Sequence, residues 1–238
     1  MENHETVPSP SAGQLLELAA AVLKQLPRDF TPKEAQYWIG HQSRLGEVLR
    51  QALKIQDIFG NVRCSIRKTQ LSRLIQLGYA EAAVLSSEAF AQLIPVPENK
   101  EGALLVISAN IVSIPKQMEL VGGSNCLDLK SLKDLVSTPK TPYWIYNVEN
   151  GKKMLNESPD ACAEYFLNQD RRGLTAIEGI NLVAQYPDVL KDHYVDLPGS
   201  RYGAACVPCL RLGGGRPRLF CPFSGSARSR YGSASCGS

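Results

Sequence analysis

The sequence predicts an α+β fold, in which a helical N-terminal part is followed by a mixed domain that ends in a β hairpin or small antiparallel sheet. Three observations predict this class. Helix-capping signals recur between residues 11 and 183, two runs of strand-forming residues occupy 103–108 and 143–148, and the last 38 residues alternate apolar and polar positions around three consecutive glycines. Helices and strands alternate irregularly, without a repeated βαβ unit, which disfavours a doubly wound sheet.

We expect residues 1–60 to form a helical N-terminal segment. Ser11 with Gln14 fits a capping box that opens a helix over 11–27. Thr31 with Glu34 repeats this signal more strongly, because Pro32 stands where a missing N–H costs nothing. The apolar face that follows continues to residue 52, and Gly40 and Gly46 allow a break between its two halves. Residues 59–61, Phe-Gly-Asn, are typical of a turn and mark the boundary of the next domain.

Residues 61–238 are expected to form the α+β domain. Capping and stop signals predict four helices there: one capped by Thr69 that ends at Gly78, one over 87–93, one opening at Ser158, and one opened by the capping box of Thr175 with Glu178. The runs at 103–108 and 143–148 are expected to be strands, since both are short and rich in β-forming residues.

The tail, residues 201–238, differs in kind from the rest of the chain. It holds six arginines and neither lysine nor acid, so it carries a charge of +6 although the whole chain carries only +3. At the acid frequency of the first 200 residues, a segment of this length would contain about four acids, so the bias is more than local variation. This charge asymmetry is the most informative feature of the sequence.

The tail is expected to fold as strands over 204–212 and 217–223, joined by Gly213, Gly214 and Gly215, because glycine permits the positive φ of a tight turn. Residues 231–238 either close the sheet as a strand or fray. Val207, Leu210, Leu212 and Leu219 would hold the hairpin through their apolar side chains.

Arginine and aromatic side chains dominate binding hot spots, since each gives a large contact area and directed interactions. We therefore expect a non-catalytic ligand- or protein-binding module whose tail makes the contacts. Its candidate binding residues are Arg201, Tyr202, Arg211, Arg216, Arg218, Phe220, Phe223, Arg228, Arg230 and Tyr231.

Nucleic acid is an alternative partner, because interleaved arginines and rings can meet phosphates and stack on bases. Against it, the tail has no lysine and the whole chain is only +3. The tail arginines also have a structural interpretation, with Arg216 and Arg218 lining the solvent side of a hairpin whose leucines point inward.

The cysteines suggest a zinc site or a catalytic thiol. Cys206 and Cys209 have the C-x-x-C spacing of a zinc site, with Cys221 and Cys236 as further ligands, although a zinc ribbon would repeat the pair. A cysteine-dependent hydrolase would need Cys236 beside His193, and nothing in their spacing connects them. The remaining acids, histidines and glycines form no recognisable catalytic set or phosphate loop, so the sequence specifies no reaction and no cofactor.

The composition also sets the expected compartment. No apolar run approaches the roughly 18 to 20 residues needed to cross a bilayer, and the N-terminus lacks the positive charge that precedes a secretory apolar region. Seven cysteines leave one unpaired in any disulfide framework, which favours free thiols in a reducing compartment. We therefore expect a cytoplasmic protein with no membrane partner.

Residues from about 66 to the end resemble an uncharacterised bacterial family with a domain of unknown function. Four segments carry this resemblance: 70–79 (QLSRLIQLGY), 174–180 (LTAIEGI), 186–190 (YPDVL) and 232–237 (GSASCG). Residues 31–40 (TPKEAQYWIG) also look like a leader common in uncharacterised bacterial proteins. Neither resemblance implies a known activity.

The tail is similar to the variable regions of proteins that retroelements diversify by miscopying adenines of a template. Randomised asparagine codons AAC and AAT can yield every residue type that the tail contains, but never Lys, Glu, Gln, Met or Trp, and the tail contains none of these five. The resemblance implies exposed, exchangeable side chains on a stable scaffold, as a diversified binding surface requires. No lectin-like motif accompanies it.

Overall fold

The computed structural model describes residues 11, 17, 24, 31–40 and 58–238. The chain divides into two compact units, Met1–Asp57 and Ile58–Ser238. The helix expected over 11–27 and the continuation expected over 41–52 lie outside the described residues, apart from residues 11, 17 and 24.

The described part of the first unit contains helix α2, Pro32–Gly40. Its start confirms the predicted capping box: the Glu34 carboxylate accepts hydrogen bonds from the Thr31 N–H at 2.8 Å and the Thr31 hydroxyl at 2.7 Å, and the Glu34 N–H donates to Thr31 Oγ1 at 3.3 Å. These bonds lower the pKa of Glu34. The cap satisfies amide donors that a helix start otherwise leaves unpaired.

The second unit is α+β, as predicted. Its helices are α4 (Ile58–Gln76), α5 (Tyr79–Ala82), α6 (Ser87–Leu93), α7 (Ile114–Leu120), α8 (Pro159–Leu167), α9 (Ala176–Gln185) and α10 (Val189–Asp192), with 3-10 turns η1 (Leu129–Ser131) and η2 (Lys152–Met154). Its strands are β1 (Leu104–Val106), β2 (Ser124–Asn125), β3 (Leu132–Asp134), β4 (Tyr143–Ile145), β5 (Arg171–Gly173), β6 (Tyr194–Asp196), β7 (Ser200–Tyr202), β8 (Cys209–Gly213), β9 (Arg216–Phe220), β10 (Tyr231–Ser233) and β11 (Ser235–Gly237).

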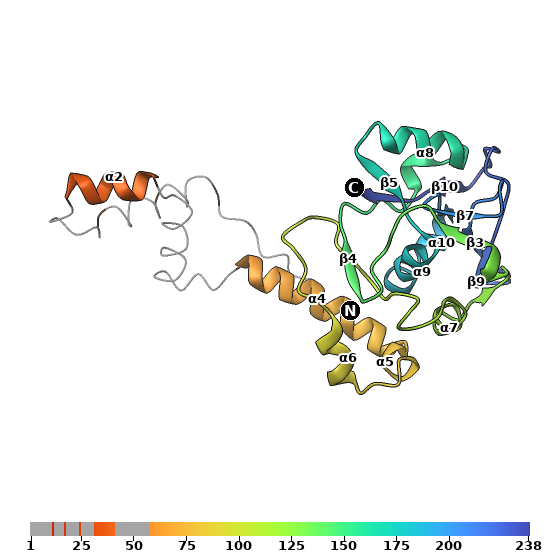
Figure 1. The fold of residues 1–238 in the computed structure, drawn as a ribbon, viewed down its shortest axis with the longest axis horizontal. Coiled ribbons are helices and arrows are strands. Elements are labelled where there is room, and N and C mark those ends of the chain that lie inside the picture. The colour runs from red at the N-terminus through yellow and green to blue at the C-terminus, as the bar shows by residue number, and fades with distance from the viewer. Residues whose placement is uncertain (1–10, 12–16, 18–23, 25–30, 41–57) are drawn as a thin grey trace. The chain divides into compact units, whose positions relative to one another are not determined.

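Helix α4 corrects two predictions. The turn expected at 59–61 is helical, and Thr69 lies inside the helix instead of capping it. A glycine inside a helix costs only about 1 kcal/mol relative to alanine, so Gly60 does not break α4. The predicted stop is confirmed, since Gly78 has a φ of 89° and its N–H donates to the Ile75 carbonyl at 2.9 Å. Helices α4, α5 and α6 gather at one end of this unit (Figure 1).

The strands form one five-stranded sheet and three strand pairs. The sheet order is β10-β6-β8-β9-β2, with β6, β8 and β9 antiparallel and the outer pairs β10/β6 and β2/β9 parallel. The two predicted strands at 103–108 and 143–148 are confirmed as β1 and β4, which pair antiparallel, as do β5 with β11 and β3 with β7. Residues 231–238, for which the sequence allows either a strand or a frayed end, supply β10 and β11.

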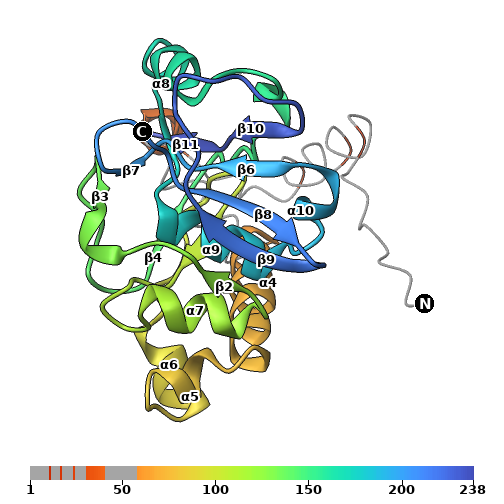
Figure 2. The same cartoon turned by 90° about the vertical axis from the view of Figure 1, so that its right-hand side faces the viewer.

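The predicted hairpin is confirmed as β8 and β9. Their two-residue turn is Gly214-Gly215, with φ values of 62° and 77°. Glycine adopts this left-handed conformation without the strain that a residue with a side chain would have. The inward leucines behave as expected: Leu210 and Leu219 are opposite each other and fully buried, and Leu212 packs against the same core. Figure 2 shows β6, β8 and β9 side by side in front of α9.

Helix α9 is the centre of the unit, because all ten of its residues are buried. It opens with the predicted capping box of Thr175 and Glu178. Strand β1 divides two apolar clusters, since Leu104 and Val106 face the cluster shared with the sheet whereas Leu105 packs with α4, α5 and α6. The two clusters therefore depend on the same buried helix and strand.

The carboxylate of Glu178, in the first turn of α9, is the acceptor of a buried hydrogen-bond network. It accepts hydrogen bonds from both terminal nitrogens of Arg172 at 2.6 and 2.8 Å, from the Thr175 N–H at 2.8 Å and from the Tyr143 hydroxyl at 3.1 Å. Because Glu178 is completely buried, its charge depends on these four donors.

The described helices contain none that combines the length and apolar character of a membrane span.

Replacing Glu178 by glutamine should lower the free energy of unfolding by about 3 kcal/mol, because it leaves the half-buried Arg172 guanidinium without its buried counter-charge. Urea denaturation followed by circular dichroism measures this loss. Glu119→Gln is the matched control, since Glu119 forms an exposed ion pair with Lys116 and such pairs contribute about 1 kcal/mol or less. Equal losses in the two variants would contradict the role of Glu178.

Candidate binding face on the C-terminal sheet

The five-stranded sheet has an apolar inner face and a polar, aromatic outer face. Val195, Leu210 and Leu219 lie at matching register positions and are buried in the core, so their neighbours along each strand point to the other side. We call that other side the arginine face. It carries Tyr194 and Asp196 from β6, Cys209 and Arg211 from β8, Arg216, Arg218 and Phe220 from β9, and Tyr231 and Ser233 from β10, with Arg228 and Arg230 from the segment before β10.

Arginine side chains on this face stack on aromatic rings. Three such pairs occur, measured from the guanidinium carbon to the ring centre: Arg211 over Phe220 at 4.1 Å, Arg228 over Tyr231 at 4.7 Å and Arg230 over Tyr194 at 5.1 Å. The two tyrosine rings pack edge to face with centres 5.0 Å apart, and Arg211 also interacts with the Tyr231 hydroxyl. A guanidinium stacked in this way keeps N–H groups at its edge for an acceptor.

The hairpin also presents arginines that no acid neutralises. The side chains of Arg216 and Arg218 are exposed on β9, and no described residue forms a hydrogen bond or an ion pair with either guanidinium. Arg230 is exposed as well, and its guanidinium donates to the Lys191 carbonyl at 3.4 Å. These three side chains give the open part of the arginine face a net positive charge.

Asp196 is the one acid of the arginine face, and it is fully buried. Its nearest cation is Arg228, with Nη2 at 3.8 Å from Oδ1, which is too long for a hydrogen bond. No hydrogen bond from the described residues satisfies either carboxylate oxygen. Burial raises the pKa of Asp196 to about 6, against the opposing effects of the Cys209 thiol and Arg228. The charged form of this carboxyl group is therefore disfavoured beneath the arginines.

The segment before β10 and helix α8 cover this acid. Arg228 donates to the Phe223 carbonyl at 3.0 Å, which folds its side chain back over the sheet. From α8, Cys162 is buried and interacts with Ser233, the neighbour of Asp196 in the β10/β6 register. Burial raises the pKa of the Cys162 thiol. Asp196 is thus covered by Arg228 and by the Cys162–Ser233 contact, and it is separated from the exposed arginines of the face.

The structure brings seven of the ten predicted binding residues to the arginine face: Arg211, Arg216, Arg218, Phe220, Arg228, Arg230 and Tyr231. The other three, Arg201, Tyr202 and Phe223, lie on β7 or after β9. Arg201 is half-buried and already bound, donating to Asp160 at 3.3 Å and to the Pro198 carbonyl at 2.9 Å. Arg201 and Arg228 are thus committed to internal contacts, whereas Phe223 is 56% exposed.

The four cysteines of the zinc interpretation do not converge. Cys206 meets Cys221, Cys209 lies beside Asp196, and Cys236 lies opposite Arg172. Nowhere in the described part of the chain do three or more His, Cys, Asp or Glu side chains gather where they could hold a metal ion. Structural zinc is normally held by four such ligands, so the described residues do not complete a zinc site around Cys206 and Cys209.

The cysteine-dependent hydrolase would need Cys236 and His193 to act as a catalytic pair, and the surroundings of the two residues do not suit that role. Cys236 is fully buried on β11, and burial raises its pKa to about 11, whereas a nucleophilic cysteine needs a lowered pKa. His193 is buried at the end of α10, and its Nε2 interacts with the Asn150 carbonyl at 2.8 Å.

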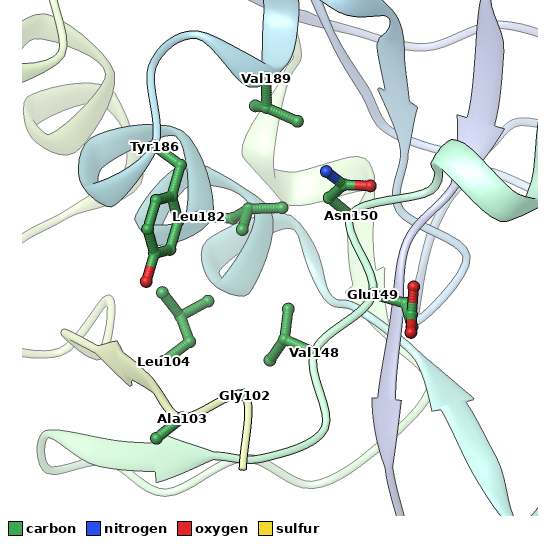
Figure 3. Close-up of a pocket in the computed structure, with 9 residues that line it drawn as sticks. All are labelled: Gly102, Ala103, Leu104, Val148, Glu149, Asn150, Leu182, Tyr186 and Val189. Carbon is green, nitrogen blue, oxygen red and sulfur yellow. The ribbon is translucent and has the colours of Figure 1, made fainter. Parts of the chain in front are cut away.

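A separate hollow of about 290 Å³ lies between the start of β1, the segment 148–150 and helix α9. Figure 3 shows its largely apolar wall, with Leu104, Val148 and Leu182 around the space, the Tyr186 ring at one side and the Glu149 carboxylate turned away. None of the ten predicted binding residues lines it.

Sequence reasoning missed Tyr194 and Asp196. Both precede the tail and reach the arginine face only because β6 lies between β10 and β8. The alternation Tyr194-Val195-Asp196, polar to apolar to polar, was the one signal, but three residues are too few to predict a strand by periodicity.

A family model described as a family of unknown function, DUF5701, matches residues 73–229, two thirds of the chain. The match includes β6, β8 and β9 and ends two residues before β10. No curated protein and no solved structure matches the chain.

The buried carboxyl group predicts a pH dependence of stability. Asp196 releases its proton near pH 3.8 in the unfolded chain and near pH 6 in the folded protein. The neutral Asp196 therefore contributes its full stability below pH 3.8, and this contribution is lost as pH rises through 6. The loss amounts to about 3 kcal/mol. Between pH 4 and pH 7, Asp196→Asn should therefore gain about this much stability relative to the unchanged protein, measured by urea denaturation at each pH.

The matched control is Asp192→Asn, which removes an exposed acid at the end of α10. That variant should keep the pH profile of the unchanged protein. Parallel stability curves for Asp196→Asn and the unchanged protein across this interval would contradict the burial of an ionisable carboxyl group.

Proposed function

The chain belongs to the DUF5701 family of unknown function, and we propose that it is a non-catalytic binding protein whose arginine face recognises an acidic partner. One observation carries this proposal: arginines stacked on rings stand beside exposed arginines that have no acid to pair with among the described residues. The partner that fits is a protein surface or ligand that presents carboxylates, because a guanidinium edge matches a carboxylate with two parallel hydrogen bonds.

The stacks favour recognition through organised guanidinium groups. A free arginine loses rotamer freedom when it binds, and this loss weakens affinity. Phe220 and Tyr194 restrain Arg211 and Arg230 before any partner arrives, so less freedom remains to be lost. The half-buried rings also supply the dehydrated surroundings in which arginine contacts are strongest.

The same stacks weigh against the nucleic-acid alternative. Single-stranded nucleic acid is commonly bound by bases that stack on exposed aromatic rings. On this face, a protein guanidinium already covers one side of Phe220, Tyr194 and Tyr231. The rings therefore hold the guanidinium groups in place, and the acceptor groups of a partner would bind the N–H groups at the guanidinium edges.

We also propose, on the resemblance of the tail alone, that its exposed positions are diversified by a retroelement. Such variation would have to spare Val207, Leu210, Leu219 and Ala234, which are buried in the core. It could change Arg216, whose side chain is exposed. A near-repeat of the tail's coding DNA beside a reverse transcriptase gene would support this part of the proposal, and its absence from the genome would refute it.

Charge reversal of the open arginines tests the binding function. Arg216→Glu, Arg218→Glu and Arg230→Glu together should weaken binding to fluorescently labelled poly-L-glutamate at least about tenfold, a change of about 1.4 kcal/mol. Fluorescence anisotropy at low and physiological salt measures it, and the affinity of the unchanged protein should fall as salt rises.

The control variant carries Lys68→Glu, Lys130→Glu and Lys140→Glu, which give the same change in net charge at exposed positions outside the arginine face. It should retain most of the binding. Equal losses in the two triple variants would show that only net charge matters, and tighter binding of a single-stranded oligonucleotide than of poly-L-glutamate would favour the nucleic-acid alternative.

A further inference from the structure

Cys206 and Cys221 lie on two segments that extend the β8–β9 hairpin beyond its last ladder pair. The register Cys209 opposite Phe220 continues to an isolated antiparallel bridge between Cys206 and Phe223. Between these positions, the Val207 N–H donates to the Pro222 carbonyl at 3.1 Å. The backbone around the two cysteines is thus held in pairing distance without being part of a regular sheet.

The register brings the two thiols to the same side of this extension. Cys206 lies opposite Phe223, and Cys221 is two residues before Phe223 on the same side of its segment, so the cysteines are diagonal neighbours. The two thiols are close enough for Cys206 to raise the pKa of Cys221. Thiols on the same side of neighbouring antiparallel segments form a disulfide when their Cα atoms approach to about 4.4–6.8 Å.

Access separates this pair from the other thiols. Cys162, Cys209 and Cys236 are each 1% exposed or less, whereas Cys126 is exposed. Cys206 and Cys221 are both half-exposed. Cys206 and Cys221 therefore combine a neighbouring thiol with access from solvent.

We propose that Cys206 and Cys221 form a reversible redox site, a dithiol that low-molecular-weight disulfides such as glutathione disulfide convert to an intramolecular disulfide. The Cys206 thiolate attacks one sulfur of the external disulfide, which forms a mixed disulfide and releases one thiolate. The Cys221 thiolate then attacks the Cys206 sulfur, which forms the Cys206–Cys221 bond and releases the second thiolate. Two electrons pass to the external disulfide, and the two protons of the protein thiols go to the two released thiolates.

The order of the two attacks follows from the surroundings of the thiols. Burial and the neighbouring Cys206 raise the pKa of Cys221 to about 12, which disfavours Cys221 as the thiol that attacks first. Once closed, the bond ties both arms of the β8–β9 hairpin together and fixes the start of the segment that carries Arg228 over Tyr231. The site does not depend on the proposed acidic partner.

The test exposes the reduced full-length chain to defined ratios of reduced and oxidised glutathione and then blocks free thiols. Mass spectrometry should show a loss of 2 Da, about two hydrogens, and peptide mapping should find residues 206 and 221 linked. The melting temperature should rise by roughly 5 °C or more, because closing a loop of this length restricts the unfolded chain, and dithiothreitol should reverse the rise.

Single substitutions sharpen the result. Cys221→Ser should keep a glutathione adduct on Cys206 and lose the rise in melting temperature, whereas Cys126→Ser, which removes an exposed thiol elsewhere, should behave as the unchanged protein. A chain that keeps both thiols free under oxidising glutathione, or a bond that joins any other two cysteines, would overturn the proposal. The mass measurement on the unchanged protein decides this even if a variant fails to fold.

Discussion

The register of the β8–β9 hairpin is the constraint on which the rest of the C-terminal sheet depends. Burying Leu210 and Leu219 against α9 fixes which residues of each strand point outward. A slip of one residue would exchange the two faces, placing Arg211 and Arg218 in the core and the leucines in water. The Gly214-Gly215 turn sets the pairing at one end of the ladder, and the neighbouring strands β6 and β2 hold β8 and β9 at their sides. The arginine face is therefore a consequence of apolar burial.

Two kinds of arginine arise from this arrangement, and they have different physical roles. Arg201 and Arg228 face acids and carbonyl groups of the protein itself, and Arg228 helps to tolerate the buried charge of Asp196. Arg216 and Arg218 face solvent with no such partner among the described residues, and Arg211 and Arg230 lie on rings that restrain them. The first kind contributes to folding, and the second is available for binding. A tail that carries both cannot be treated as a uniformly charged patch.

Local signals in the sequence predicted the parts of the fold that local chemistry decides. The capping boxes of Thr31 and Thr175, the stop at Gly78 and the glycine turn of the hairpin each follow from a few neighbouring residues, and each is confirmed. The turn expected at 59–61 was wrong because helix propagation through α4 outweighs one glycine. The sequence could not place Tyr194 and Asp196 on the arginine face, since β6 joins β10 and β8 through non-local pairing. Nor could it show that Cys206 meets Cys221 and not Cys209, because register and not spacing selects the pair.

The proposed function requires that Arg216 and Arg218 of the hairpin are open to solvent, whereas Arg172 of the same unit is held by Glu178. Modification of the native protein with phenylglyoxal, followed by peptide mapping in a mass spectrometer, measures this for each arginine. Arg216 and Arg218 should react at rates near those of the unfolded chain, and Arg172, bound to the buried Glu178 by two short hydrogen bonds, should be strongly protected. Protection of Arg216 and Arg218 to the same degree as Arg172 would contradict an open arginine face.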